Sequence, residues 1–97
     1  MLNMIIDDFL WLPDIVEKLY VKHRVTQEEV EEFLFSKPHF RFVESGKRTG
    51  ENVYLAAGQL ESGRYLIVFF IHKSGNIAFI LSARDMDKKE RKRYERR

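Results

Sequence analysis

The side chains of this chain that could do chemistry are cations and proton carriers. They form a set of nine: Lys22, His23, Arg24, Arg64, Arg84, Lys88, Arg91, Lys92 and Tyr94. Cleavage of RNA without a metal ion needs such groups. A base must take the 2′-hydroxyl proton, a cation must hold the scissile phosphate and an acid must protonate the leaving oxygen. The set therefore suits a metal-independent ribonuclease.

Some of these residues also have a structural interpretation. Lys22 and His23 close an expected helix, where cations complement the negative end of the helix dipole. Arg84 is expected where a core strand becomes a helix, beside unpaired N–H groups that could bind phosphate. The alternative for Arg84 is a salt bridge to a nearby acid, namely Asp85, Asp87 or Glu90. The sequence leaves both interpretations open.

The basic residues are concentrated at the C-terminal end. Residues 84–97 carry eight Lys or Arg and four Asp or Glu, a charge of +4, whereas the whole chain carries +2. A basic end on a near-neutral body suggests an anionic partner, most commonly nucleic acid. A solvated helix rich in Lys and Arg is the alternative. Arg91 and Tyr94 are three apart and share one face of that helix, where Tyr94 could equally be a core residue with its hydroxyl at the rim.

Composition excludes several kinds of site. The chain has no cysteine, which removes disulfides, thiolate catalysis and cysteine zinc sites. His23, His39 and His72 have no metal-binding spacing such as i, i+4 on a helix. We therefore expect no metal and no cofactor. No apolar run approaches the roughly 20 residues of a membrane helix, and the N-terminus does not resemble a targeting segment. We expect a cytoplasmic protein with no membrane association.

The helices are predicted from their end signals. Pro13 suits a first helical turn, and apolar residues at helical spacing extend this helix over Pro13–His23. Thr26 and Glu29 have the spacing of a capping box that starts a second helix. Val25 and Val30 stand at the positions of a hydrophobic staple. Asp87 and Glu90 repeat the capping-box spacing before the C-terminal basic helix.

Four segments read as strands: His39–Glu44, Asn52–Leu60, Arg64–Ile71 and Ile77–Leu81. Short turns between them indicate antiparallel pairing. The nearly continuous apolar run of Arg64–Ile71 is typical of a central strand. Asn3–Trp11 is either a short strand or an extended lead-in. We predict a single α+β domain over residues 1–97, with two N-terminal helices, a four-stranded antiparallel sheet that carries helices on one face, and a C-terminal basic helix.

Three groups of residues resemble the signatures of a known family. Leu81-Ser82-Ala83-Arg84, followed by Glu90-Arg91 and Tyr94-Glu95, is similar to a strand that ends in SAR and is followed by ER and YE. Lys22-His23-x-Val25 resembles a KHGV motif, and Phe9-x-Trp11 resembles the opening that precedes it. Together, in this order, they resemble the BrnT family over nearly the whole chain.

The resemblance implies a RelE-like fold and a ribonuclease toxin of a type II toxin–antitoxin system. Such a toxin cuts RNA without a metal, inhibits translation and is neutralised by a ribbon-helix-helix antitoxin of BrnA type. The resemblance implies catalytic roles for four residues: Lys22, His23, Arg84 and Tyr94. The other cations of the set are predicted to bind RNA: Arg24, Arg64, Lys88, Arg91 and Lys92. The oligomeric state is not predicted.

The chain departs from the family pattern at informative positions. Arg24 stands where the family has glycine, and Leu19 where it usually has asparagine. Val53 and Phe79 stand where it has arginine. The loss of two arginines matters because a site that cleaves phosphodiesters without metal depends on cations; Arg24 and Arg64 are candidate substitutes. The alternative function is a catalytically silent RNA- or protein-binding regulatory domain on the same fold.

Overall fold

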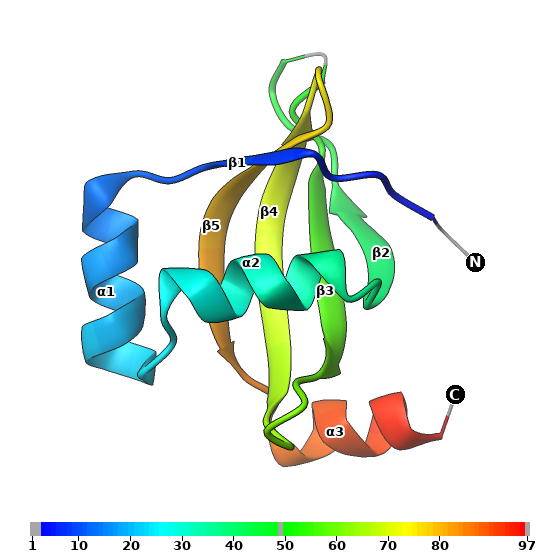
Figure 1. The fold of residues 1–97 in the computed structure, drawn as a ribbon. Helices are drawn as coiled ribbons and strands as arrows, with labels where there is room; N and C mark the ends of the chain where they lie inside the picture. The colour runs from blue at the N-terminus through cyan, green and yellow to red at the C-terminus, as the bar shows by residue number, and fades with distance from the viewer. Residues whose placement is uncertain (1–2, 49, 97) are drawn as a thin grey trace.

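A mixed sheet is the centre of the fold in the computed structural model, which describes residues 3–48 and 50–96 (Figure 1). Over these residues the sheet has five strands, in the spatial order β1-β5-β4-β3-β2. The strands are β1 (Asp8–Leu10), β2 (His39–Glu44), β3 (Val53–Gln59), β4 (Tyr65–Lys73) and β5 (Ile77–Asp85). The helices are α1 (Pro13–His23), α2 (Gln27–Phe35) and α3 (Lys88–Glu95). The chain is a small α+β domain, as predicted.

The prediction of four antiparallel strands was wrong in one respect. Strand β1 joins the sheet parallel to β5, with Phe9 opposite Ala78. The other neighbouring strands pair antiparallel. Only three residues of β1 pair with β5. Because β1 and β5 are far apart in the sequence, no short turn between them could have indicated the pairing. From the sequence, Asn3–Trp11 could be either a short strand or an extended lead-in. Pairing with β5 makes Asp8–Leu10 a strand.

Strand β5 is also longer than predicted. Ser82, Ala83 and Arg84 continue the ladder instead of turning into the helix, and Ala83 lies opposite Val68. The chain leaves the sheet after Asp85 and enters α3 at Lys88. Arg84 is thus the second-last residue of β5, paired within the sheet just before the chain turns into α3.

The end signals of the helices are confirmed. Helix α1 has proline at its start, and both predicted capping boxes are formed, at α2 and at α3. Val25 and Val30 are completely buried. Arg24 caps the end of α1 with φ 55° and ψ 38°. That left-handed conformation favours glycine, so the arginine at this position strains the backbone.

Helix α2 crosses one face of the sheet (Figure 1). Its Phe33 packs so near β3 that a Cβ on Gly58 would lie 3.0 Å from the Phe33 ring. The absence of a side chain at Gly58 therefore lets α2 approach the sheet closely. The core lies between α1, α2 and this face of the sheet: Ile6, Leu19, Val25, Val30, Phe33, Leu34, Ala56, Leu66, Val68, Phe70, Ala78, Ile80 and Ala83.

Helix α3 packs on the other face, so the expectation that the helices share one face was wrong. Leu55, Ala57 and Ile67 lie beneath α3 and alternate with residues of the core. Successive side chains of a strand point to opposite faces, so this face is the one that α2 does not cover. In Figure 1, α3 runs across one end of the sheet, where β4 begins and β5 ends. The sheet thus has a second, partly covered face, and Arg84, Glu90 and Tyr94 of the C-terminal motif lie on it.

Candidate functional site

One row of residues crosses the sheet beneath α3. His39 of β2 lies opposite Ala57 of β3, Ala57 opposite Ile67 of β4, and Ile67 opposite Arg84 of β5. Residues in register share a face, so these four side chains point to the side that carries α3. The row places Arg84 of the predicted site on the same face as His39, which lies at the other end of the row and which the sequence analysis did not place in the site.

Arg84 attaches α3 to the sheet through an ion pair. Its Nη1 and Nη2 donate to the two carboxylate oxygens of Glu90 at 2.7 and 2.9 Å. The Glu90 carboxylate also accepts from the backbone N–H of Asp87 and so closes the capping box of α3. The hydrogen bond from Arg84 lowers the pKa of Glu90, and the hydrogen bond to Glu90 raises the pKa of Arg84. Of the two interpretations of Arg84, the structure contains the salt bridge.

Tyr94 faces the sheet from the same helix. Its ring meets the rings of Tyr65 and His39 edge to face, with centroids 5.9 and 6.0 Å apart. The guanidinium of Arg91 lies over the Tyr65 ring, 4.2 Å from its centroid. Arg91 and Tyr94 therefore flank one aromatic ring of β4, as expected for residues on one helix face. Tyr94 is half-buried, next to the imidazole of His39.

A cavity of about 190 Å³ lies between α3 and the sheet. Its floor is apolar, and its rim carries aromatic and charged groups. The lining residues are His39, Arg41, Leu55, Ala57, Ile67, Glu90, Arg93 and Tyr94. Sequence reasoning named Tyr94 but missed His39, Arg41 and Arg93. His39 and Arg41 alternate along β2, which is a signal that they share a face, but no local pattern shows that this face meets α3.

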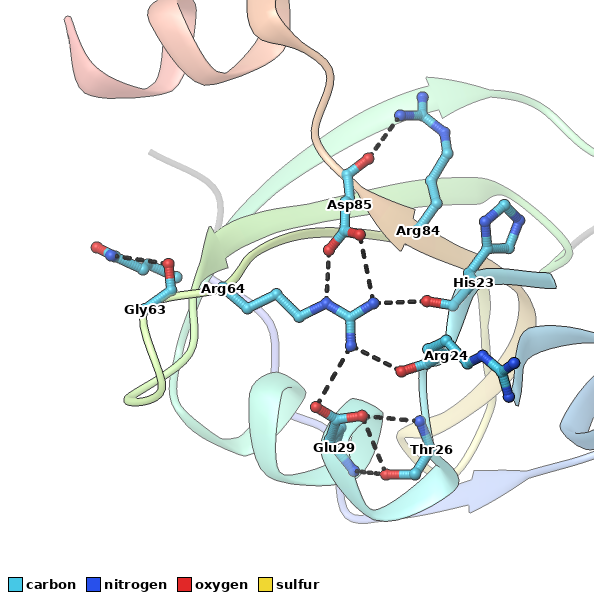
Figure 2. A network of polar contacts seen from close by, with 9 residues as sticks. His23, Arg24, Thr26, Glu29, Gly63, Arg64, Arg84 and Asp85 are labelled. Carbon is cyan, nitrogen blue, oxygen red and sulfur yellow. Dashed lines mark hydrogen bonds and ion pairs between the residues drawn. The ribbon is translucent and has the colours of Figure 1, made fainter. Parts of the chain in front are cut away.

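Arg64 is the centre of a second network, on the side of α2 (Figure 2). Its guanidinium binds both carboxylate oxygens of Asp85 and donates to the backbone carbonyls of His23 and Arg24. Glu29 adds an ion pair at 3.6 Å. The hydrogen bond to Asp85 raises the pKa of Arg64. All three of its nitrogens contact acceptors of the chain itself, which gives Arg64 a structural role. RNA binding by Arg64 stays a prediction.

The Arg64 network places His23 near the C-terminal motif. Arg64 holds the main chain of His23 against Asp85, the residue next to Arg84. Figure 2 shows the His23 imidazole and the Arg84 side chain extending to the same side, away from the Arg64 guanidinium. Lys22 is exposed in the last turn of α1. The structure thus brings the end of α1 to the end of β5, although the two are far apart in the sequence.

The other predicted RNA-binding residues lie on the surface. Lys88 and Lys92 are exposed on α3, and Arg24 is exposed at the end of α1, where its guanidinium lies 5.6 Å from the centroid of the Tyr20 ring. These positions are open to a large anionic partner, and the role of the three cations stays a prediction.

The two positions where arginine is missing lie in one row of the sheet. Val53 lies opposite Ile71, and Ile71 lies opposite Phe79, so all three form one row on the α3 side of the sheet. The Nζ of Lys73 lies 5.3 Å from the centroid of the Phe79 ring and 3.7 Å from a carboxylate oxygen of Glu51. Where the family has two arginines, this end of the face therefore has an apolar row. The neighbouring cation, Lys73, is itself paired with Glu51.

Two further features bear on chemistry and location. Within residues 3–48 and 50–96, no group of three or more His, Cys, Asp or Glu side chains could hold a metal ion. In the same part of the chain, no helix is long and apolar enough to cross a membrane.

Comparison with known protein families gives a match over most of the chain. A family model described as "Ribonuclease toxin, BrnT, of type II toxin-antitoxin system" matches residues 11–90. This span runs from the start of α1 to the Glu90 that holds α3 on the sheet. A search of curated proteins finds no match.

Proposed function

Because this chain belongs to the BrnT family of ribonuclease toxins of type II toxin–antitoxin systems, we propose that it is a RelE-like endoribonuclease that cuts RNA without a metal ion and inhibits translation. It acts in the cytoplasm until a ribbon-helix-helix antitoxin of BrnA type covers it. The observation that carries the proposal is the position of Arg84 and Tyr94. They lie on one face of the sheet, beside a cavity that also holds His39, Arg41 and Arg93.

The proposed reaction uses side chains alone. A base, His23 or Lys22, takes the proton of the 2′-hydroxyl, and the 2′-oxygen attacks the adjacent phosphorus. The bond from phosphorus to the 5′-oxygen breaks, and Tyr94 gives that oxygen a proton. The products are a 2′,3′-cyclic phosphate and a 5′-hydroxyl. Arg84 stabilises the charge on the phosphate, which requires the phosphate to replace the Glu90 carboxylate as its partner.

The basic surface of α3 supports RNA as the substrate and an acidic protein surface as the inhibitor. Lys88 and Lys92 are exposed on this helix beside Arg91. Cations on an exposed helix attract the RNA backbone through counterion release, which makes binding fall steeply with salt. The antitoxin would compete for the same cations.

Induced expression in a bacterial host tests the proposal through growth, protein synthesis and RNA integrity. We expect arrested growth, reduced labelling of new protein and RNA fragments that end in a cyclic phosphate. Tyr94→Phe should relieve the arrest while the protein stays folded, whereas Lys89→Ala, an exposed change on the same helix, should not. The purified protein should cut RNA in the presence of a chelator. Intact RNA with folded wild-type protein would refute the proposal, and activity that the chelator abolishes would refute metal independence.

The apolar row of Val53, Ile71 and Phe79 favours a second candidate. A face that lacks two cations can bind RNA or a protein and yet stabilise the transition state poorly. In that case the chain is a catalytically silent regulatory domain on the same fold. Purified protein that binds RNA and cuts none of it would favour this candidate, and restoration of cleavage by Val53→Arg with Phe79→Arg would establish the reason.

A further inference from the structure

We infer that the cavity between α3 and the sheet is a nucleotide subsite, which takes one unstacked base of single-stranded RNA and places a neighbouring phosphate on Arg41 and Arg93. The inference deepens the proposed function and rests on it for the identity of the polymer. It concerns binding at His39, Arg41 and Arg93, which are additional to the residues assigned to the reaction.

The shape of the cavity follows from the row beneath it. Ala57 is the smallest member of the row and lies between His39 and Ile67. A methyl side chain between two larger ones leaves a hollow in the sheet surface, and Leu55 forms the rest of the floor. The volume of about 190 Å³ is below the roughly 300–1,000 Å³ of sites for drug-sized ligands. The hollow therefore suits a single flat ring system.

The walls match the chemistry of a base. His39 and Tyr94 present aromatic rings at the edge of the hollow, and the floor is aliphatic. Every nucleobase has an apolar π-face that stacks on such side chains, and this recognition tolerates any sequence. Glu90 contributes the carboxylate of the wall. This carboxylate, which the backbone N–H of Asp87 holds in the α3 capping box, can accept a hydrogen bond from an exocyclic amine.

Two arginines on the rim of the cavity, Arg41 and Arg93, favour an anionic ligand. Neither Arg41 nor Arg93 forms a salt bridge with any residue that the structure describes, and both side chains are exposed. The charge of Arg93 also helps to lower the pKa of Glu90, which lines the same cavity. They extend from β2 and from α3, on two sides of the hollow. A ring beside an anion is the chemistry of a nucleotide, and the exposed Lys88 and Lys92 on α3 extend the positive surface for the rest of the strand.

Binding of a non-cleavable RNA tests the subsite. The probe is a short single-stranded RNA with 2′-O-methyl riboses throughout, which removes the nucleophile, and its counterpart is the same backbone without bases. Fluorescence anisotropy with labelled probes should show the wild type binding the base-containing strand about tenfold more tightly, in the range expected for loss of one stacked base. Ala57→Leu, which fills the hollow, should abolish this difference.

The rim has a matched control in the same chain. Arg41→Ala should weaken binding of both probes, whereas Arg48→Ala, which removes an exposed arginine from the loop after β2, should leave both unchanged. Thermal unfolding checks that each variant is folded, and Ala57→Val replaces Ala57→Leu if the larger side chain prevents folding.

The results separate this inference from the proposed function. Equal affinity of the wild type for the two probes, or a difference that survives the filling of the hollow, overturns the subsite. Failure of both probes to bind also overturns it and leaves the hollow for a side chain of a protein partner. The tenfold preference in a protein that cuts no unmodified RNA would support the subsite and refute the proposed ribonuclease. Cleavage of unmodified RNA by a protein that binds both probes equally would support the proposed ribonuclease and refute the subsite.

Discussion

Replacement of Arg64 by methionine is expected to destabilise the fold strongly, because one guanidinium joins the ends of three elements. Arg64 binds the main chain at the end of α1, Asp85 at the end of β5 and Glu29 in the first turn of α2. Its side chain is 23% exposed. Methionine keeps the apolar part of the side chain and removes the charge with its donors, so the measurement isolates the polar contacts.

The expected loss can be worked from those contacts. The hydrogen bond from Arg64 to the partly buried carbonyl of His23 contributes about 1.5–3 kcal/mol, the range for a charged donor. The pair with Asp85, whose side chain is 58% exposed, contributes about 0–1 kcal/mol. The exposed bond to the carbonyl of Arg24, 2.8 Å long, contributes about 0.5–1 kcal/mol. The free energy of unfolding should therefore fall by about 2–5 kcal/mol.

Urea denaturation followed by circular dichroism measures this change. With a denaturant slope of about 2 kcal/mol per molar, the unfolding midpoint should fall by roughly 1–2.5 M. Arg48→Met, at an exposed loop arginine, is the control and should change stability by less than about 0.5 kcal/mol. A change equally small for Arg64→Met would refute the structural role. If RNA binding were lost at the same time, Arg64 would instead be an RNA ligand, as the sequence analysis predicted.

Three further predictions concern single residues. Glu90→Gln should cost about 1–2 kcal/mol at neutral pH. The pKa of Glu90 is lowered in the folded chain, so the stability that Glu90 contributes is present above the unfolded pKa of about 4.3 and disappears as the pH falls through the folded value. The free energy of unfolding of the variant should therefore fall less steeply with pH below about 4.3 than that of the wild type. An equally steep fall in both proteins would contradict the pairing. Arg24→Gly should raise stability by about 0.5–1 kcal/mol in thermal unfolding by relieving the left-handed backbone at φ 55°, and a loss of stability would show that the arginine side chain stabilises the helix end. Gly58→Ala should cost about 1–3 kcal/mol, since the new Cβ lies 3.0 Å from the Phe33 ring, and an unchanged urea midpoint would mean that α2 shifts without penalty.

Much of the local structure could be predicted because its causes lie within a few residues. A proline at the first turn of α1 and the two capping boxes act over one helical turn, and all three are confirmed. The four antiparallel strands were predicted from apolar runs and turns between neighbours in the chain. Strand β1 and the last four residues of β5 were not, because their pairing depends on partners that no short-range pattern identifies.

The residues of the candidate site also differ in whether a local sequence pattern identifies them. Arg84 and Tyr94 belong to a motif that can be read in one stretch of sequence, and this motif led to the family. His39 and Arg41 lie in a different segment, and only the register of β2 on β3 brings them beneath α3. Likewise, the sequence shows Arg64 only as one of several cations. Its contacts with Asp85 and Glu29 in the folded chain give it a structural role.

By itself, therefore, the sequence determined the helix ends, the main strands, the α+β class and the family. These depend on side-chain periodicity and on contacts within one turn or one hairpin. The tertiary structure alone decided which face of the sheet α3 covers, that Arg84 binds Glu90, and that His39 and Arg41 share a cavity with Tyr94. The physical reason is that a period of two shows which side chains share a face of a strand. What packs on that face depends on free energies summed over the whole fold.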